Sequence, residues 1–463
     1  MMNEYDLDTT IAALSSGNQR VPIGIIRISG TLSLHIMKRI FDPLAKELVS
    51  ERTAIHGWFK NPKTGEKIDE GILVYYKAPK SYTREHMLEL FTHGNPIIMN
   101  EILALCIHEG ARIAQPGEFT YRAFINGRID LVQAEALNEL INADSIYHAK
   151  AALKNLEGKF SEHLNNIKKE LLTLIAHGEA EIDFAETDDI ESSGNFVQHI
   201  HVIKVQLKKF IAMHKEKRYL SGGYTIAIVG KANAGKSSLF NILLNKNRAI
   251  ITEIAGTTRD YITEKILIEN FPVTLIDTAG MRTARNKIEK IGIERTIEMV
   301  NKTDGVILLF DGSKRWDNQD EQICAGWKDK ALMAVINKHD LPQKLRVEKV
   351  SGLVTGLNIP LIQTSLVTNY GTDKVELCLR EKIKTILAKY SEDDILINVR
   401  QYSIMRKCLK ELEKTERALH KGISLEYIVL GLNEARKQID QLTGMTCADD
   451  ILGIIFSKFC IGK

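Results

Sequence analysis

The stretch Gly230-Lys-Ala-Asn-Ala-Gly-Lys-Ser237 decides the fold of the central part of this chain of 463 residues. It directly follows the apolar run Thr225–Val229, which predicts a strand, a glycine-rich turn and the start of a helix in succession. Glycine lets backbone N–H groups approach an anion closely, because no Cβ lies in the way. Lys236 can then reach the β- and γ-phosphates of a nucleotide, and the Ser237 hydroxyl can bind Mg²⁺. The stretch therefore predicts the phosphate cradle of an α/β P-loop domain.

The segment Asp277-Thr-Ala-Gly280 supplies the next part of a nucleotide site. It directly follows the apolar run Val273–Ile276, so Asp277 is expected at the C-terminal edge of a strand, where α/β sheets bind ligands. Asp277 is a natural partner of the Mg²⁺ ion, and Gly280 lets the backbone turn beneath a γ-phosphate. Both residues are therefore predicted to lie at the phosphate end of the site.

The segment Asn337-Lys338-His339-Asp340 follows a third apolar run, Leu332–Ile336. A carboxylate at Asp340 can accept two hydrogen bonds, from N1–H and from the exocyclic amine of guanine, and adenine lacks this donor pair. We therefore predict that the nucleotide is GTP or GDP rather than an adenine nucleotide. Thr364-Ser365-Leu366 is a candidate for the loop behind the base.

Two groups that assist hydrolysis in Ras-like proteins are missing from this sequence. Met281 stands where a water-orienting glutamine is expected, and a thioether cannot orient an attacking water. No arginine is identifiable as a finger that reaches the phosphates, although Arg259, Arg282 and Arg285 lie nearby in sequence. Hydrolysis therefore needs another group to orient the water and another positive partner for the charge that develops between the phosphates.

The composition fits a multidomain soluble enzyme. With 44% hydrophobic and 26% charged residues, the chain can bury more than one core. The net charge of +3 neither supports nor excludes a nucleic-acid partner. The six cysteines form no C-x-x-C pair, which fits a reducing cytoplasm and argues against a disulfide framework or a zinc ribbon. The sequence has no secretory signal and no apolar run of membrane-spanning length, so a cytoplasmic protein with no membrane segment is predicted.

The sequence pattern changes along the chain in a way that predicts its domains. Residues 1–120 alternate short strand-like and helical runs, which is typical of an α+β domain. Residues 121–220 repeat apolar residues at helical spacing, and residues 379–463 do so again. Between them, after the flexible joint Ser221-Gly222-Gly223, residues 221–378 have the size of one GTPase domain. We predict one helical domain interrupted by an inserted G domain, with two independent helical arms as the alternative.

Further motifs stand in a fixed order along the chain. They are Thr10-Ile-Ala-Ala-Leu14, Gly24-Ile-Ile-Arg-Ile-Ser-Gly30, Ser81-Tyr-Thr-Arg-Glu85, Leu88-Glu-Leu90, His93-Gly94, Gln115-Pro-Gly-Glu-Phe-Thr120, Arg122-Ala-Phe-Ile-Asn126, Asp130-Leu-Val-Gln-Ala-Glu135, Asn233-Ala-Gly-Lys-Ser-Ser238, Ile254-Ala-Gly-Thr-Thr-Arg-Asp260 and Phe459-Cys-Ile-Gly-Lys463. In this order they resemble the tRNA-modification GTPases of the TrmE/MnmE type along nearly the whole chain. The order and the terminal tetrapeptide make the resemblance specific.

The resemblance implies a multidomain fold and a reaction. Members have an α+β N-terminal folate-binding domain, an all-α helical domain and an inserted, Ras-like α/β P-loop GTPase domain, and they form homodimers through their N-terminal domains. In a heterotetramer with an FAD protein of the GidA/MnmG type, they modify C5 of the wobble uridine of tRNA to an aminomethyl-type derivative. A tetrahydrofolate one-carbon unit supplies the methylene. Glycine, ammonium or taurine supplies the amine, and the sequence does not distinguish among these.

The resemblance also implies that GTP hydrolysis depends on K⁺, which takes the charge-neutralising position of an arginine finger. Glu289 would orient the attacking water, although from the residues alone it is one acid on a charged stretch. Thr258 would join Ser237 in binding Mg²⁺. The K⁺ ligands would be Asn233, Thr252, Ile254 and Thr257. The expected GTP contacts are Asn233, Ala234, Gly235, Lys236, Ser237, Ser238, Thr252, Thr257, Thr258, Asp277, Gly280, Asn337, Lys338 and Asp340, with Lys236 and Glu289 as catalytic residues.

The folate contacts implied by the resemblance are Arg27, Glu89, Arg128 and Lys463, for a 5-formyl- or methylene-tetrahydrofolate. Guanidinium groups bind carboxylates in a bidentate manner, which suits Arg27 and Arg128 to the glutamate tail. Glu89 suits the pterin ring, which presents adjacent N–H donors. Without the resemblance, each residue would be interpreted as a surface or strand-edge salt-bridge residue.

The C-terminal tail is expected to be functional. The apolar segment Ile451–Phe456 is predicted to anchor it and to aim Cys460 and Lys463 at the N-terminal domain. Cys460 either assists the chemistry or is a buried structural cysteine, and the terminal lysine argues against a prenylation box.

The competing function is a regulatory or ribosome-assembly GTPase that performs no modification itself. The motif Asn233-Ala-Gly-Lys-Ser237 is shared with such proteins, so the G domain does not separate the two functions. An assembly factor would more often carry an appended RNA-binding module, and the N-terminal domain and tail favour the modification enzyme.

Overall fold

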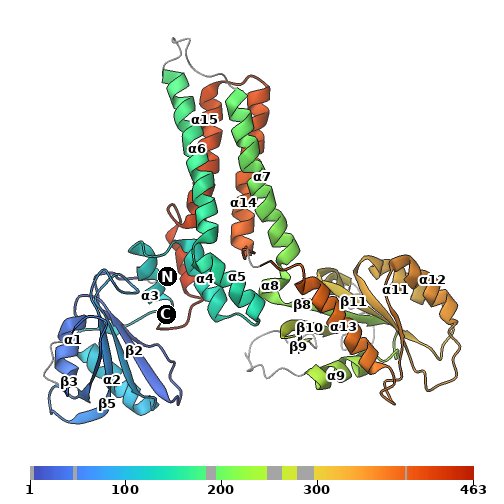
Figure 1. The fold of residues 1–463 in the computed structure, drawn as a ribbon, viewed down its shortest axis with the longest axis horizontal. Helices are drawn as coiled ribbons and strands as arrows, with labels where there is room; N and C mark the ends of the chain where they lie inside the picture. The colour runs from blue at the N-terminus through green and yellow to red at the C-terminus, as the bar shows by residue number, and fades with distance from the viewer. Residues whose placement is uncertain are drawn as a thin grey trace, which may run out of the picture. The chain divides into compact units, whose positions relative to one another are not determined.

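The structure is a computed structural model that describes residues 5–44, 50–183, 194–247, 263–278, 297–391 and 394–462. These residues divide into two compact units. The first unit comprises residues 1–141, 152–212 and 397–463, and the second comprises residues 142–151 and 213–396, each within the described ranges. Figure 1 traces the elements of both units along the chain.

The N-terminal part of the first unit is a seven-stranded sheet with the order β3-β4-β5-β6-β2-β1-β7. All neighbouring strands are antiparallel except β1 and β7, which are parallel. The elements are β1 Ile11–Leu14, β2 Ile23–Ser29, α1 Ser33–Ile40, β3 Phe41–Pro43, β4 Ala54–Lys60, β5 Lys67–Tyr76, β6 Met87–His93, α2 Pro96–His108 and β7 Arg112–Ile113.

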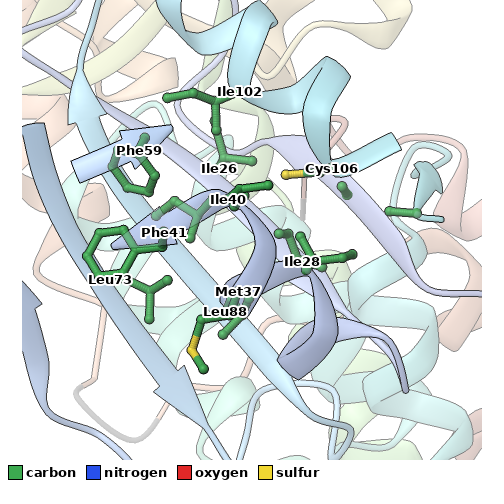
Figure 2. Packing of buried hydrophobic residues seen from close by; sticks show 14 of the residues in the cluster. Ile26, Ile28, Met37, Ile40, Phe41, Phe59, Leu73, Leu88, Ile102 and Cys106 are labelled. Atoms are coloured by element: carbon green, nitrogen blue, oxygen red, sulfur yellow. The ribbon is translucent and has the colours of Figure 1, made fainter. Parts of the chain in front are cut away.

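Side-chain alternation along two of these strands decides where Arg27 and Glu89 lie. Ile26 and Ile28, the neighbours of Arg27 on β2, are fully buried in a core that includes side chains of α1 and α2 (Figure 2). The neighbours of Glu89 on β6 are leucines that enter the same core. Successive side chains of a strand point to opposite faces. Because Arg27 is also the register partner of Glu89, the two charged side chains meet on the face away from this core.

Helices that precede and follow the main segment of the second unit in sequence pack together in the rest of the first unit. The long helices α6, α7, α14 and α15 lie side by side (Figure 1). Lys204 of α7 forms an ion pair with Glu416 of α14. The ring centroids of Phe160 on α6 and Phe210 on α7 lie 5.3 Å apart. The prediction of one helical domain is therefore confirmed, and the alternative of two independent arms is wrong. The helices are α3 Glu118–Ile125, α4 Leu131–Ile141, α6 Lys159–Asp183, α7 Gly194–Lys217, α14 Val399–His420, α15 Leu425–Thr443 and α16 Asp449–Phe456. The helix α5 Ile146–Leu156 is divided between the two units after residue 151.

Within the described ranges, no helix combines the length and the apolar character that crossing a bilayer requires.

The second unit is built on a six-stranded sheet with the order β13-β12-β11-β8-β10-β9. All strands are parallel except β9, and every residue of the central strand β11 is buried, as expected for a sheet covered on both faces. The predicted α/β P-loop fold is confirmed. The elements are α8 Tyr219–Gly222, β8 Tyr224–Gly230, α9 Lys236–Asn247, β9 Thr263–Ile268, β10 Phe271–Asp277, β11 Gly305–Asp311, α11 Asn318–Trp327, η2 Lys328–Lys330, β12 Ala331–Asn337, α12 Val347–Leu357, β13 Leu361–Gln363 and α13 Thr372–Leu387.

Residues 142–151 belong to the second unit, although the sequence pattern groups them with the first helical segment. The ring of Tyr147 lies 6.2 Å from that of Phe271 and 5.4 Å from that of Tyr390, measured between centroids. At the other end, α13 continues past residue 378. The domain boundaries drawn from the sequence stay predictions.

Candidate functional site

The turn between β8 and α9 is shaped for close backbone approach. Asn233 and Gly235 have φ angles of 60° and 106°, in the left-handed region that favours glycine and tolerates asparagine. A Cβ on Gly235 would lie 2.4 Å from Nδ2 of Asn337, and one on Gly230 would lie 2.2 Å from the carbonyl oxygen of Leu309. Packing therefore requires glycine at both positions, and at Gly235 the backbone conformation requires it as well.

Lys236, the first residue of α9, turns back into this loop. Its Nζ donates hydrogen bonds to the carbonyl oxygens of Gly230, at 3.0 Å, and Lys231, at 2.8 Å. The side chain is nearly buried, with 6% of its residue surface exposed. The ammonium group is thus held within the turn that is predicted to receive the phosphates.

Asp277 ends β10, and its register partner on β8 is Ile228, two residues before the end of that strand. Thr278 fixes this strand end, because its Oγ1 donates to the carbonyl oxygen of Ile228 at 2.7 Å. Ser237 and Ser238 lie exposed in the first turn of α9. Carboxylate and hydroxyl oxygens are the hard donors that Mg²⁺ prefers, so the donor set at these strand and helix ends fits the predicted metal.

Asn337 and Asp340 tie together the loops around the predicted base position. Nδ2 of Asn337 donates to the carbonyl oxygen of Ala234 at 2.8 Å, and its Oδ1 accepts from the backbone N–H of Leu366 at 3.2 Å. Oδ1 of Asp340 accepts from Oγ of Ser365 at 2.5 Å. The loop that the sequence suggested behind the base therefore lies beside Asp340.

Two further contacts that the sequence reasoning missed hold the loop after β12. Nζ of Lys338 lies 2.7 Å from Oδ2 of Asp311. Burial alone would raise the pKa of Asp311, but hydrogen bonds from Lys338 and Ser313 outweigh it and lower this pKa below its ordinary value. The imidazole of His339 stacks on the ring of Tyr370, with centroids 5.2 Å apart. Asp311 could have been found by its place directly after the apolar run of β11.

Several predicted site residues cannot be placed, because they lie outside the described residues. They are Thr252, Ile254, Thr257, Thr258, Gly280, Glu289 and Lys463.

The second candidate site is a cavity of about 660 Å³ in the first unit. Arg27, Glu89 and Arg128 all line it, so the structure brings these three predicted residues together. Nε and Nη2 of Arg27 both donate to Oε1 of Glu89, at 3.0 and 2.7 Å, and the hydroxyl of Tyr76 donates to Oε2 at 2.9 Å. Burial and this hydrogen bond to Glu89 raise the pKa of Tyr76. The inner wall of the cavity is thus a fixed, internally neutralised charge pair.

Tyr82 is a site residue that the sequence reasoning did not single out. Two arginine heads lie over its ring, with the guanidinium carbons of Arg27 and Arg128 at 5.7 and 4.8 Å from the ring centroid. Its hydroxyl shares a hydrogen bond of 2.9 Å with Oγ1 of Thr120. Burial raises the pKa of Tyr82. The tyrosine therefore orients the two cations that the sequence assigned to the ligand.

A buried network supports the segment that carries Tyr82. Arg122 is fully buried, and its Nη1 donates to both carboxylate oxygens of Glu85, at 3.1 and 3.0 Å. Its Nη2 donates to Glu118, which also accepts two bonds from Arg112. Removing one partner from a buried ionic network is strongly destabilising, so Arg122 fixes the loop after β5 against α3.

The C-terminal tail reaches the same cavity wall. The ring of Phe456, at the end of α16, lies 5.2 Å from that of Tyr121, which confirms that the apolar segment anchors the tail. The carbonyl oxygen of Gly462 accepts hydrogen bonds from Oγ of Ser15, at 3.0 Å, and Nη1 of Arg27, at 3.2 Å.

Cys460 is exposed on this tail. The alternative that it is a buried structural cysteine is therefore wrong. Phe456 and Phe459, which precede Cys460, are buried.

Comparison with known proteins gives the family of the chain. The family described as MnmE helical domain matches residues 131–460, and that described as GTP-binding protein TrmE N-terminus matches residues 10–128. The protein named tRNA modification GTPase MnmE in Aquifex aeolicus is 39% identical over 98% of this chain and 99% of its own. Proteins of the same name are 37% identical in Acetivibrio thermocellus, over 98% of this chain and 99% of theirs, and 36% identical in Thermotoga maritima, over 98% and 100%. These matches cover nearly the whole chain, including the segments that carry the nucleotide site and the N-terminal cavity. The chain therefore belongs to the MnmE (TrmE) family.

Proposed function

We propose that this chain hydrolyses GTP in the course of tRNA modification, as the names of its relatives state for them. In the finer form of the proposal, a cytoplasmic homodimer works with an FAD protein of the GidA/MnmG type in a heterotetramer. The complex converts C5 of the wobble uridine to an aminomethyl-type derivative with a tetrahydrofolate one-carbon unit.

At the nucleotide site, the chain's residues bind and orient GTP. Asp340 accepts the guanine donors while Ser365 holds one of its oxygens, and Lys236 places a positive charge in the phosphate turn. Bound Mg²⁺, held by Ser237 and Thr258, would neutralise phosphate charge. Glu289 orients the attacking water. The K⁺ ligands are proposed to be Asn233, Thr252, Ile254 and Thr257.

One observation carries the modification half of the proposal, namely the convergence of Arg27, Glu89 and Arg128 on one cavity. Its volume of about 660 Å³ is in the range of small-molecule sites. Glu89 offers acceptor oxygens to the N–H groups of a pterin, and the arginines suit carboxylates. A reduced folate would supply the one-carbon unit, and the chain's residues bind and orient it. A GTPase that acts only as a switch has no need of this cavity.

The test is mass spectrometry of wobble nucleosides from a strain that lacks the gene. We expect the modified uridines to disappear and to return with the wild-type gene but not with Glu89→Gln. The matched control is Glu70→Gln, which removes the charge of an exposed carboxylate that contacts His56 in the same sheet and should restore modification. Circular dichroism of purified Glu89→Gln checks its fold. Unchanged nucleosides in the deletion strain would instead favour the regulatory or assembly GTPase.

A further inference from the structure

The cavity wall carries more positive charge than its inner pair explains. Arg27 is neutralised by Glu89, and both side chains are half-buried. Four further cationic residues, all exposed, line the same cavity and are here called the outer ring: Arg52, Lys80, Arg84 and Arg128. Among the described residues, no member of the outer ring forms an ion pair with a carboxylate. Its charge therefore remains available to a ligand.

The arginines of the outer ring are held in place without losing their charge. One guanidinium nitrogen each of Arg52, Arg84 and Arg128 donates to a backbone carbonyl oxygen, at 3.0, 2.9 and 3.2 Å. A carbonyl is a neutral acceptor, so these bonds orient each head while the other N–H donors stay free to form charge-assisted bonds.

The backbone at two of these arginines is also unusual. Arg52 and Arg84 have φ angles of 59° and 60°, in the left-handed region that a long side chain rarely adopts. Such strain persists where the surrounding structure imposes it, and it gathers at ligand sites. Both strained arginines line the same cavity.

We propose that the outer ring binds the carboxylates of a poly-γ-glutamyl tail, so that the site prefers folates that carry several glutamates. This inference rests on the proposed folate function of the cavity. A single glutamate offers two carboxylates, and each γ-linked residue adds one more net negative charge. A ring of four cations exceeds the charge of a monoglutamate and matches that of a triglutamate. The phosphate backbone of RNA is the other anion to consider, but the four cations share their cavity with Arg27 and Glu89, the residues proposed to bind the folate.

The experiment is calorimetric titration of the full chain with the mono- and triglutamate forms of 5-formyl-tetrahydrofolate. We expect tighter binding of the triglutamate, by about fivefold for each added glutamate, which corresponds to one ion pair at an exposed site. Because exposed charges are screened, the preference should shrink at high salt.

Two variants and one control attribute the preference to the outer ring. Lys80→Gln and Arg84→Gln should each reduce the triglutamate-to-monoglutamate ratio. Lys80 suits this test because its side chain has no hydrogen-bond or ion-pair partner among the described residues, so its loss cannot act through the fold. Lys63→Gln removes an exposed lysine outside the cavity, and the full ratio should remain.

The outcomes separate this inference from the proposed function. Equal affinities for the two folates, or a ratio that survives both outer-ring substitutions, would overturn the inference and leave the folate site standing. Displacement of the monoglutamate by tRNA with no dependence on tail length would assign the ring to RNA and overturn it as well. If neither folate binds, the proposed folate function fails and the inference fails with it.

Discussion

Replacing Tyr82 by leucine should weaken folate binding while the N-terminal sheet stays folded. The ring lies 5.7 and 4.8 Å from the guanidinium carbons of Arg27 and Arg128. Each cation–π contact is worth about 0.5–1 kcal/mol at an exposed site and ~2 kcal/mol when desolvated. Since Arg128 is exposed and Arg27 half-buried, we expect a loss of about 1–2 kcal/mol, or roughly a 5- to 30-fold larger dissociation constant.

The matched control is Tyr82→Phe, which keeps the ring and removes only the hydrogen bond to Thr120. Titration of the full chain with 5-formyl-tetrahydrofolate should give nearly wild-type affinity for this variant, with a stability loss of about 1 kcal/mol. GTP hydrolysis by the same preparations reports on folding of the second unit, and circular dichroism reports on the secondary structure of the whole chain. An unchanged affinity in Tyr82→Leu would refute the reasoning. Equal losses in both variants would show that the hydroxyl, not the ring, orients the arginines.

Four further measurements test other parts of the molecule. Asp340→Asn should weaken GTP binding by about two orders of magnitude, because two charge-assisted bonds to guanine are lost, and should favour xanthosine triphosphate; unchanged GTP affinity contradicts the base assignment. Turnover should be faster in KCl than in NaCl at equal ionic strength, and Glu289→Ala should lose turnover but keep GTP binding; equal rates in the two salts would exclude the K⁺ role. Deleting Cys460–Lys463 should abolish wobble-uridine modification yet leave basal GTP hydrolysis, and normal nucleoside levels in the complemented strain would show that the tail is dispensable. An NMR titration should place the pKa of His93 above its ordinary value because of its hydrogen bond to Asp69, and Asp69→Asn should restore it. The contact between His93 and Asp69 then stabilises the fold fully when the pH is below the ordinary pKa of histidine. This stabilisation is lost as the pH rises through the raised pKa of His93.

The nucleotide site could be predicted from the sequence because each of its parts is local. A short apolar run becomes a strand, and the polar residues that follow it lie at the strand's end. Asp277 and Asn337 each follow such a run, and the parallel strands β10 and β12 bring both to the C-terminal edge of one sheet. The motif order therefore predicted the fold of this unit and placed these candidate site residues at one edge of its sheet.

The N-terminal cavity was decided by tertiary structure. The alternation of apolar and polar residues along a strand predicts which face of the sheet each side chain occupies. It does not predict which other strand pairs with that strand. The pairing of β2 with β6 joins Arg27 to Glu89 across 62 positions, and the packing of α16 brings Gly462 to Ser15 across 447. The outer ring, the place of Tyr82 and the exposure of Cys460 have the same origin. They depend on contacts between segments remote in sequence, and no periodicity within one segment records such contacts.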